Sequence, residues 1–302
     1  MTDAPRVSII LPTFNRAAVL PESVASVLQQ GHRDFELLIV DDGSTDDTSA
    51  MIAARFGADP RIRLLRTANA GPAAARNLAL RAARGELIAF QDSDDLWLPE
   101  KLALQVRQAD EHPEADLFFC DAYDRGGPGA GRTRFQGKGY RGDVSLRGIV
   151  AFQFPLCTPA VLVRRAALET VGLFDPALDG AEDWDLWMRL LERFPAVLLD
   201  RPLVILRAQP DSLSRTRLLM KWRAMVELFT RHEARLLRAD CPASLVRRRL
   251  AHAHRKLAQT CRTLGLREEA RRNYLAWWRL QPLQLPALFW WMALSLPHSA
   301  PR

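Results

Sequence analysis

The sequence has few cysteines and no long apolar run. Its four cysteines (Cys120, Cys157, Cys241 and Cys261) are scattered over 302 residues. They are too few for a disulfide scaffold, and none forms the C-x-x-C spacing of a zinc site. No apolar stretch forms the ~20-residue span that a membrane helix needs. The N-terminal residues lead into a strand-like run with no signal peptide before it. These absences predict reduced thiols and a cytoplasmic protein.

Two common nucleotide-binding fingerprints are also missing. No G-x-G-x-x-G follows the first apolar run, and no G-x-x-x-x-G-K-[ST] occurs in the chain. The first absence disfavours a dinucleotide-binding fold, and the second excludes a P-loop. The contents of hydrophobic residues (48%) and charged residues (25%) are those of an ordinary globular protein.

Charge is divided unevenly along the chain. Residues 213–302 contain 18 Lys and Arg residues against five Asp and Glu residues, whereas residues 1–212 contain 24 basic and 30 acidic residues. A basic tail can meet nucleic acid, anionic lipid or only solvent. The mildly acidic remainder argues against a nucleic-acid-binding face there, and we expect no nucleic-acid partner.

Short apolar runs alternate with helical patterns over the first 90 residues. The apolar runs predict strands at 7–11, 35–40, 62–65 and 87–90, and the intervening patterns predict helices after residue 16, at about 47–56 and at about 72–83. Near-continuous apolar character is typical of strands that are covered on both faces. The sequence therefore predicts an α/β fold with a mostly parallel sheet and helices on both of its faces.

Acidic residues follow the strand predicted at 87–90. Asp92, Asp94 and Asp95 offer hard oxygen ligands, which suit Mg²⁺ or Mn²⁺ carrying a diphosphate. An isolated D-x-D-D pattern also fits a helix cap with solvated acids. Ligands of doubly wound sheets bind beyond the carboxyl ends of the strands, which makes these acids candidates, but the motif alone does not decide between the two interpretations.

Asp41 and Asp42 end a second apolar run and have the same ambiguity. The sequence that follows them, Gly43-Ser44-Thr45, forms turns and helix caps by itself. Two acids at the end of a buried strand are less easily explained as turn residues. We expect a carboxylate there to accept hydrogen bonds from a nucleobase N–H group or from ribose hydroxyls.

Five segments in this order resemble the family-2 glycosyltransferases. They read VSIILPTFNR (7–16), VDDGSTD (40–46), NAGPAAARN (69–77), QDSDD (91–95) and EDWDLW (182–187). The resemblance implies a GT-A catalytic domain over residues 1–215, followed by a basic, Trp-rich helical extension over residues 216–302. It also implies an inverting hexosyl transfer from a nucleotide-diphosphate sugar, a UDP-sugar, to a hydroxyl of a glycan or lipid-linked acceptor, as in cell-surface polysaccharide synthesis.

The resemblance also implies a role for each matching residue. The nucleotide-sugar-binding set would be Pro12, Phe14, Asp41, Asp42, Asn69, Arg76, Asp92 and Asp94, the metal ligands Asp94 and Asp95, and the general base Asp183. A divalent cation, Mn²⁺ or Mg²⁺, would stabilise the charge that develops on the departing diphosphate. A carboxylate would remove the proton of the acceptor hydroxyl, which is otherwise a poor nucleophile.

Two features leave alternatives open at this point. Glu182 and Asp183 also fit simple charge compensation at a helix N-terminus. Gln209 stands where many members of the family have histidine, and Arg207 and Arg215 beside it are candidate phosphate contacts. The alternative functions are a non-catalytic nucleotide-sugar-binding protein and a sugar-phosphate nucleotidyltransferase. The latter normally shows a glycine-rich loop with Arg and Lys after the first strand, which is lacking here.

The tail carries two helical patterns, at 247–264 and 268–280, and then an uncharged segment at 283–296 with adjacent tryptophans. Tryptophan favours the headgroup zone of a bilayer and arginine attracts anionic lipid. The pattern predicts peripheral association with the cytoplasmic face of the inner membrane. Docking of the tail on the protein's own core is the alternative.

Overall fold

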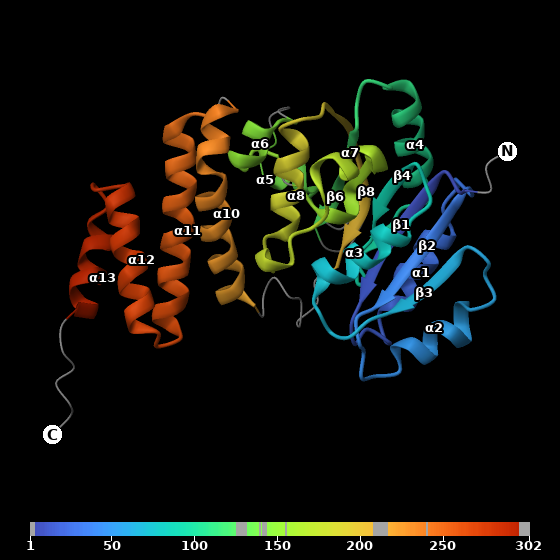
Figure 1. The fold of residues 1–302 in the computed structure, drawn as a ribbon, viewed down its shortest axis with the longest axis horizontal. Coiled ribbons are helices and arrows are strands. Elements are labelled where there is room, and N and C mark those ends of the chain that lie inside the picture. The colour runs from blue at the N-terminus through green and yellow to red at the C-terminus, as the bar shows by residue number, and fades with distance from the viewer. Residues whose placement is uncertain are drawn as a thin grey trace. The chain divides into compact units, whose positions relative to one another are not determined.

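The computed structural model, drawn in Figure 1, describes residues 4–124, 132–138, 140, 144–154, 156–207, 217–239 and 241–295. The chain divides into two compact units. The first consists of the described residues of Met1–Pro176 and Glu182–Gln209, and the second of those of Ala177–Ala181 and Pro210–Arg302. Each unit is described separately below.

The first unit is built on an eight-stranded sheet with the order β3-β2-β1-β4-β7-β6-β8-β5. The strands are β1 (Val7–Thr13), β2 (Phe35–Asp41), β3 (Ile62–Arg66), β4 (Leu87–Phe90), β5 (Leu96–Trp97), β6 (Leu117–Asp124), β7 (Val161–Arg164) and β8 (Ala196–Leu206). Six strands run in one direction, while β7 and β5 are antiparallel to their neighbours. The predicted α/β fold with a mostly parallel sheet is confirmed.

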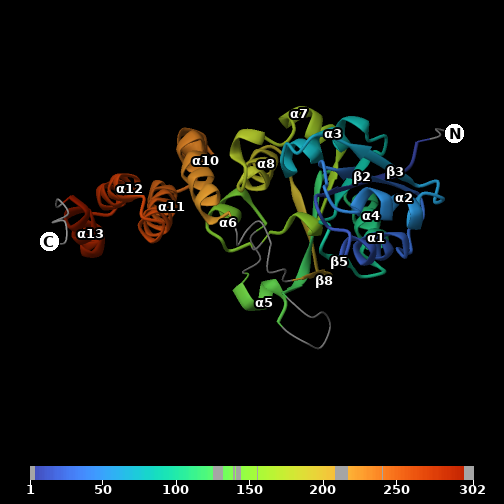
Figure 2. The same ribbon diagram turned by 90° about the horizontal axis from the view of Figure 1, so that it is seen from below.

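Helices cover both faces of this sheet. They are α1 (Leu20–Leu28), α2 (Thr48–Phe56), α3 (Pro72–Ala82), α4 (Lys101–Glu111), α5 (Arg134–Lys138), α6 (Leu146–Val150), α7 (Arg165–Val171) and α8 (Glu182–Leu191), with short 3₁₀ turns at Thr158–Ala160 and Pro176–Leu178. Figure 2 shows α3 and α7 on one side of the sheet and α1 and α4 on the other. Proline starts α3 directly after Gly71, because proline has no N–H to lose at the first helical position.

The core follows the alternation of side chains along the central strands. Val7 and Ile9 of β1 pack with α1, α2 and α4 in one apolar cluster. On the other face, the ring of Phe90 meets Trp187 of α8 edge-on, with centroids 5.5 Å apart. Strands buried on both faces need apolar side chains at nearly every position, which explains the continuous runs in the sequence.

The described part of the second unit consists mainly of the helices α10 (Leu218–Arg238), α11 (Ala243–Thr263), α12 (Arg267–Leu280) and α13 (Leu285–Ser295). Each helix packs against the next, as Figure 1 shows. Their core contains Cys261, Ala270, Tyr274 and Ala287. The chain reverses at Gly265, which has a φ of +74° that favours glycine. Within the described part of the chain, no helix combines the length and the apolar character needed to cross a membrane.

Candidate active site

Three strands end side by side at one edge of the sheet. Thr13 of β1 is paired with Asp41 of β2, and Ile10 of β1 is paired with Phe90 of β4. The segments after these strands, 14–16, 42–48 and 91–95, therefore emerge at a common edge. This parallel register brings together the polar segments that the sequence singled out, at the edge where such sheets bind ligands.

The loops after β1 and β2 are bound to each other by short hydrogen bonds. Thr45 N donates to Asn15 Oδ1 over 2.8 Å, and Asn15 N donates to Ser44 Oγ over 2.9 Å. Gly43 has a φ of +76°, and a Cβ on it would lie 2.9 Å from Asn69 N. Only glycine fits that position without strain. The edge is thus rigid on this side before any ligand arrives.

Asp41 is fully buried at the end of β2. Its carboxylate accepts hydrogen bonds from Ser44 N at 2.8 Å and from the Ser49 hydroxyl, and lies 3.5 Å from Arg66 Nε. Burial raises the pKa of Asp41, but these hydrogen bonds outweigh it and the pKa is lowered overall. Asp41 is therefore an ionised anchor of the loop between β2 and α2.

Asp42 holds the turn that begins α3. Its Oδ1 accepts a hydrogen bond from Ala70 N and its Oδ2 from Gly71 N, both at 2.9 Å. Burial raises the pKa of Asp42 despite these bonds, and the neighbouring Asp41 adds to the rise. Each carboxylate oxygen has two acceptor positions, so the side chain retains capacity for a further donor.

The remaining predicted nucleotide contacts are accessible from this edge. Phe14 is 37% exposed, which is unusual for a large aromatic side chain beside a buried strand. Asn69 is exposed and Pro12 is half-buried. An exposed ring presents a flat apolar face on which a planar base can stack.

Asp92, Asp94 and Asp95 form an acidic turn after β4. Asp95 N donates to Asp92 O over 3.2 Å, which closes the turn, and Asp95 Oδ1 accepts a hydrogen bond from Arg207 N at 2.9 Å. Burial, followed by the charge of Asp92, raises the pKa of Asp94 and raises that of Asp95 well above its usual value. Carboxylates this close repel one another unless a cation or a proton intervenes.

A divalent cation is compatible with this turn. In the described ranges, no three His, Cys, Asp or Glu side chains converge as a preformed metal cage. Mg²⁺ seldom uses such a cage, because one or two carboxylates usually hold it together with substrate phosphates and water. Asp94 and Asp95 supply hard oxygen donors whose mutual repulsion a bound cation would relieve.

Arg76 of α3 joins the acidic turn to the first residues of α8. Its Nη1 lies 3.0 Å from Glu182 Oε1 and its Nη2 lies 3.0 Å from Asp92 Oδ1. The guanidinium also lies over the ring of Phe174, 5.4 Å from its centroid. Burial lowers the pKa of Arg76, but the surrounding carboxylates outweigh it and the pKa is raised. The buried guanidinium of Arg76 therefore joins two residues, Asp92 and Glu182, that are 90 positions apart in the sequence.

Asp183, the predicted general base, follows Glu182 at the start of α8. Its Oδ1 accepts a hydrogen bond from its neighbour's backbone, Trp184 N, at 2.8 Å, and its Oδ2 faces the Thr158 hydroxyl at 3.5 Å. Burial and the charge of Glu182 raise the pKa of Asp183 to about 6, against the opposing effect of Arg76. A carboxylate with this pKa is ionised at neutral pH and is a stronger base than an ordinary aspartate.

Arg207, a candidate phosphate contact, has other partners in the structure. Its guanidinium pairs with Glu22 and donates to the Val19 carbonyl at 3.2 Å and to the Asp94 carbonyl. These bonds brace the acidic turn against α1. Gln209 and Arg215, the other residues of that basic segment, lie outside the described residues.

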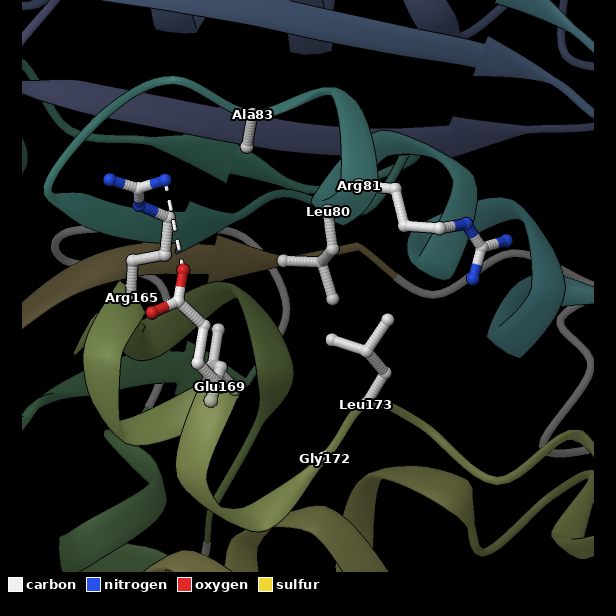
Figure 3. Close-up of a pocket in the computed structure, with 8 residues that line it drawn as sticks. Leu80, Arg81, Ala83, Arg165, Glu169, Gly172 and Leu173 are labelled. Carbon is white, nitrogen blue, oxygen red and sulfur yellow. Dashed lines mark ion pairs between the residues drawn. The ribbon is translucent and has the colours of Figure 1, made fainter.

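The structure also contains a pocket away from these residues. Figure 3 shows it between the end of α3 and α7, with a volume of about 370 Å³ and with Leu80, Leu168 and Leu173 among its lining residues. An ion pair of 3.7 Å between Arg165 and Glu169 crosses its rim. None of the predicted site residues lines this pocket.

Sequence reasoning missed two side chains of the site. The sequence motifs give Glu182 no specific partner, yet it is the buried partner of Arg76. They do not single out Thr158, yet its hydroxyl faces Asp183. Glu182 is visible in the sequence as the first residue of a Glu-Asp pair, whereas no signal in the sequence marks Thr158.

Comparison with solved structures defines the class of fold. The chain is similar to the crystal structure of Staphylococcus aureus TarS 1–349, with a TM-score of 0.65 and 24% identity over 94% of this chain and 83% of that one. A structure of the same TarS fragment with UDP-GlcNAc aligns with a TM-score of 0.66 and 22% identity, over the same shares of the two chains. The first unit thus has the GT-A type of nucleotide-binding fold.

Sequence comparison gives the family. Residues 8–172 match the model of glycosyl transferase family 2. The putative glycosyltransferase EpsE of Bacillus subtilis is 32% identical over 226 residues, which cover 71% of this chain and 77% of EpsE. The chain therefore belongs to glycosyl transferase family 2.

Other relatives match over shorter segments. The Escherichia coli UDP-Glc:α-D-GlcNAc-diphosphoundecaprenol β-1,3-glucosyltransferase WfgD is 46% identical over 101 residues, which cover 33% of this chain and 39% of WfgD. An uncharacterized glycosyltransferase of Rickettsia felis is 47% identical over 107 residues, which cover 35% of this chain. The matched segment spans only 18% of that relative's length.

Proposed function

We propose that the protein transfers a hexose from a UDP-sugar, with inversion at the anomeric carbon, to a hydroxyl of a glycan or lipid-linked acceptor. The observation that supports this proposal is the bridge from part-buried Asp92 through buried Arg76 to buried Glu182, the residue before Asp183. The acidic turn at residues 92–95 and Asp183 differ in their environments. The acidic turn suits binding of the donor diphosphate, and Asp183 suits removal of a proton from the acceptor.

Asp183 is the general base in this proposal. Its pKa of about 6 leaves it ionised at neutral pH, yet close enough to that pH for efficient proton removal. The acceptor oxygen attacks the anomeric carbon as Asp183 takes its proton, and the bond from that carbon to the diphosphate oxygen breaks. A single displacement of this kind inverts the anomeric carbon.

The donor lies along the carboxyl edge of β1, β2 and β4. Phe14 and Pro12 contact the base, Asp41 and Asp42 border the nucleoside, and Asn69 and Arg76 flank it. Asp92 and Asp94 would face the sugar diphosphate, and Asp94 and Asp95 would hold a divalent cation, Mn²⁺ or Mg²⁺. A cation bound there would supply positive charge to stabilise the departing diphosphate. A UDP donor is supported by TarS, solved with UDP and with UDP-GlcNAc, and by WfgD, whose name specifies UDP-Glc.

The acceptor and setting are proposed from the same relatives. WfgD is named for an acceptor carried on diphosphoundecaprenol, a lipid-linked sugar. We assign the catalytic domain to residues 1–215 and the basic, Trp-rich extension to residues 216–302. A lipid-linked acceptor would be reached by a cytoplasmic enzyme on the inner face of the membrane, in polysaccharide synthesis.

A panel of nucleotide sugars tests this function. The melting temperature of the full chain is measured with each UDP-sugar and GDP-sugar in the presence of Mn²⁺, and release of free nucleoside diphosphate is measured in parallel. A ligand that binds the folded state raises the melting temperature by mass action. We expect one UDP-sugar to give the largest rise and to be turned over.

The alternatives give different results in the same assays. A non-catalytic nucleotide-sugar-binding protein would show the thermal shift with no release of UDP under any acceptor condition. A sugar-phosphate nucleotidyltransferase would release pyrophosphate from a nucleoside triphosphate and a sugar 1-phosphate. Either result would overturn the proposed transfer reaction.

A further inference from the structure

The last helix of the second unit exposes an apolar stripe. Leu285, Phe289 and Met292 lie at helical spacing on one side of α13 and are 71%, 58% and 48% exposed, and Leu283 before them is 93% exposed. We call these four residues the terminal apolar face. The opposite side of α13, with Ala287, Trp290 and Leu294, packs into the core of the unit. A helix that is apolar all round is ordinarily covered on all sides.

We infer that the terminal apolar face docks on the surface of an anionic lipid bilayer. Charge is the first reason: residues 213–302 contain 18 basic and five acidic residues, and no charged residue occurs from Gln281 to Ser295. Basic groups around an uncharged apolar helix match a surface with acidic headgroups outside and acyl chains beneath. A second copy of this chain would bring the same excess of positive charge and would be repelled.

Exposed arginines beside α13 are the second reason. The Arg262 guanidinium lies 3.9 Å from the ring centroid of Trp290, and Trp290 stacks on Tyr274. Arg262 is exposed, so its charge lies at the surface beside α13. Exposed Arg279 lies in the last turn of α12, four residues before Leu283. Basic side chains beside an apolar helix face are typical of a helix held at the level of the headgroups.

The length of α13 agrees with this placement. The helix has 11 residues, about half of the ~20 that a membrane span needs. A helix lying in the plane of the interface buries one apolar side and leaves its other side against the protein. The terminal apolar face and the packed side of α13 have this arrangement.

Vesicle binding by the full chain tests the inference. Co-sedimentation is measured with vesicles of phosphatidylglycerol and phosphatidylcholine and with vesicles of phosphatidylcholine alone. We expect binding to the anionic vesicles that weakens at high salt, and about a tenfold loss of affinity for Phe289→Glu. Leu285→Ser is the second variant and should lose affinity in the same direction. Leu237→Glu, at a 43% exposed leucine of α10, is the matched control and should bind as the parent does.

Three outcomes would overturn the inference. The parent chain could fail to bind anionic vesicles, Phe289→Glu could bind as tightly as the parent while keeping its melting temperature, or sedimentation without lipid could show a dimer that Phe289→Glu abolishes. The last result would identify a second copy as the partner. The inference rests on the proposed function in one respect only, namely that the proposed acceptor is linked to a lipid. Because vesicle binding uses neither donor nor acceptor, its failure and failure of the transferase assay are separate results.

Discussion

The two units of this chain differ in how their charged side chains are buried and paired. In the first unit, Arg76 of the candidate site is withdrawn from water and joined to partners farther along the sequence, Asp92 and Glu182. In the second unit, charges of one sign remain largely at the surface and large apolar groups are exposed at one end. The first arrangement fixes residues of the candidate site in place, and the second suits contact with a charged, apolar surface.

Removal of Arg76 should have the largest effect on stability. Arg76→Met leaves the carboxylates of Asp92 and Glu182 without their cation, and breaking a buried pair costs about 3–5 kcal/mol of the free energy of unfolding. Urea denaturation of the variant measures the loss. Arg107→Met is the control, because Arg107 forms only an exposed i,i+4 pair with Glu111 and should cost under about 0.5 kcal/mol.

Equal losses in the Arg76 and Arg107 variants would contradict the contrast between buried and exposed ion pairs within the first unit. They would mean that the buried bridge is no stronger than a surface pair. A loss confined to Arg76→Met would show that the bridge is a specific part of the first unit.

Lys101 of the first unit is a buried charged residue without an ionic partner among the described residues, in contrast to Arg76. Its replacement should therefore stabilise the protein, whereas replacement of Arg76 should destabilise it. Lys101 is fully buried at the start of α4, 3.7 Å from the ring centroid of Trp97, and its Nζ has no hydrogen-bond partner in the described part of the chain. Burial lowers its pKa to about 8. Lys101→Met, which keeps the volume, should raise the free energy of unfolding at pH 7 by about 1–3 kcal/mol.

The pH dependence of the free energy of unfolding is a second test of the prediction for Lys101. Between the folded pKa of about 8 and the ordinary value of 10.5, the unfolded chain binds more protons at Lys101 than the folded chain does. The free energy of unfolding should therefore rise with pH across this window, and the rise should be smaller in Lys101→Met. A less stable Lys101→Met variant would show that the ammonium is better accommodated than its contacts indicate.

A single exposed charge in the second unit should have the smallest effect. Arg279→Gln should change the free energy of unfolding by less than about 0.5 kcal/mol. It should weaken binding to anionic vesicles about fivefold, since one basic side chain near such a surface contributes about 1 kcal/mol. Urea denaturation and co-sedimentation of the same preparation measure both. A large loss of stability with unchanged vesicle binding would place Arg279 in the architecture of the unit instead.

The strands that carry the site were predictable from sequence because they are continuous apolar runs. β1, β2, β3 and β4 all lie where such runs predicted them. β8 (Ala196–Leu206) was not predicted, since Asp200, Arg201 and Pro202 interrupt its apolar pattern. The structure accommodates them where the pairing with β6 shifts in register. Proline cannot donate to a ladder and ordinarily marks the end of a strand.

The candidate site was predictable as a set of residues but not as a network. The order of the motifs predicts that Asp92 and Asp183 belong to the same site. Nothing local in the sequence predicts the contact between Arg76 and Glu182, which is 106 positions away. The roles of Asp42 and Arg207 were also underdetermined. Both hold neighbouring backbone in place, and such contacts depend on how loops meet after the sheet has formed.

The central claim is that Asp183 takes the proton of the acceptor. The direct test is the rate of UDP release in the presence of acceptor, measured against pH for the parent chain and for Asp183→Asn. Because the base must be ionised, the parent rate should rise with pH through about 6 and then level off. Asp183→Asn should bind the donor as the parent does but react about 10²–10⁴-fold more slowly. A variant with the parent's rate and pH profile would contradict the account.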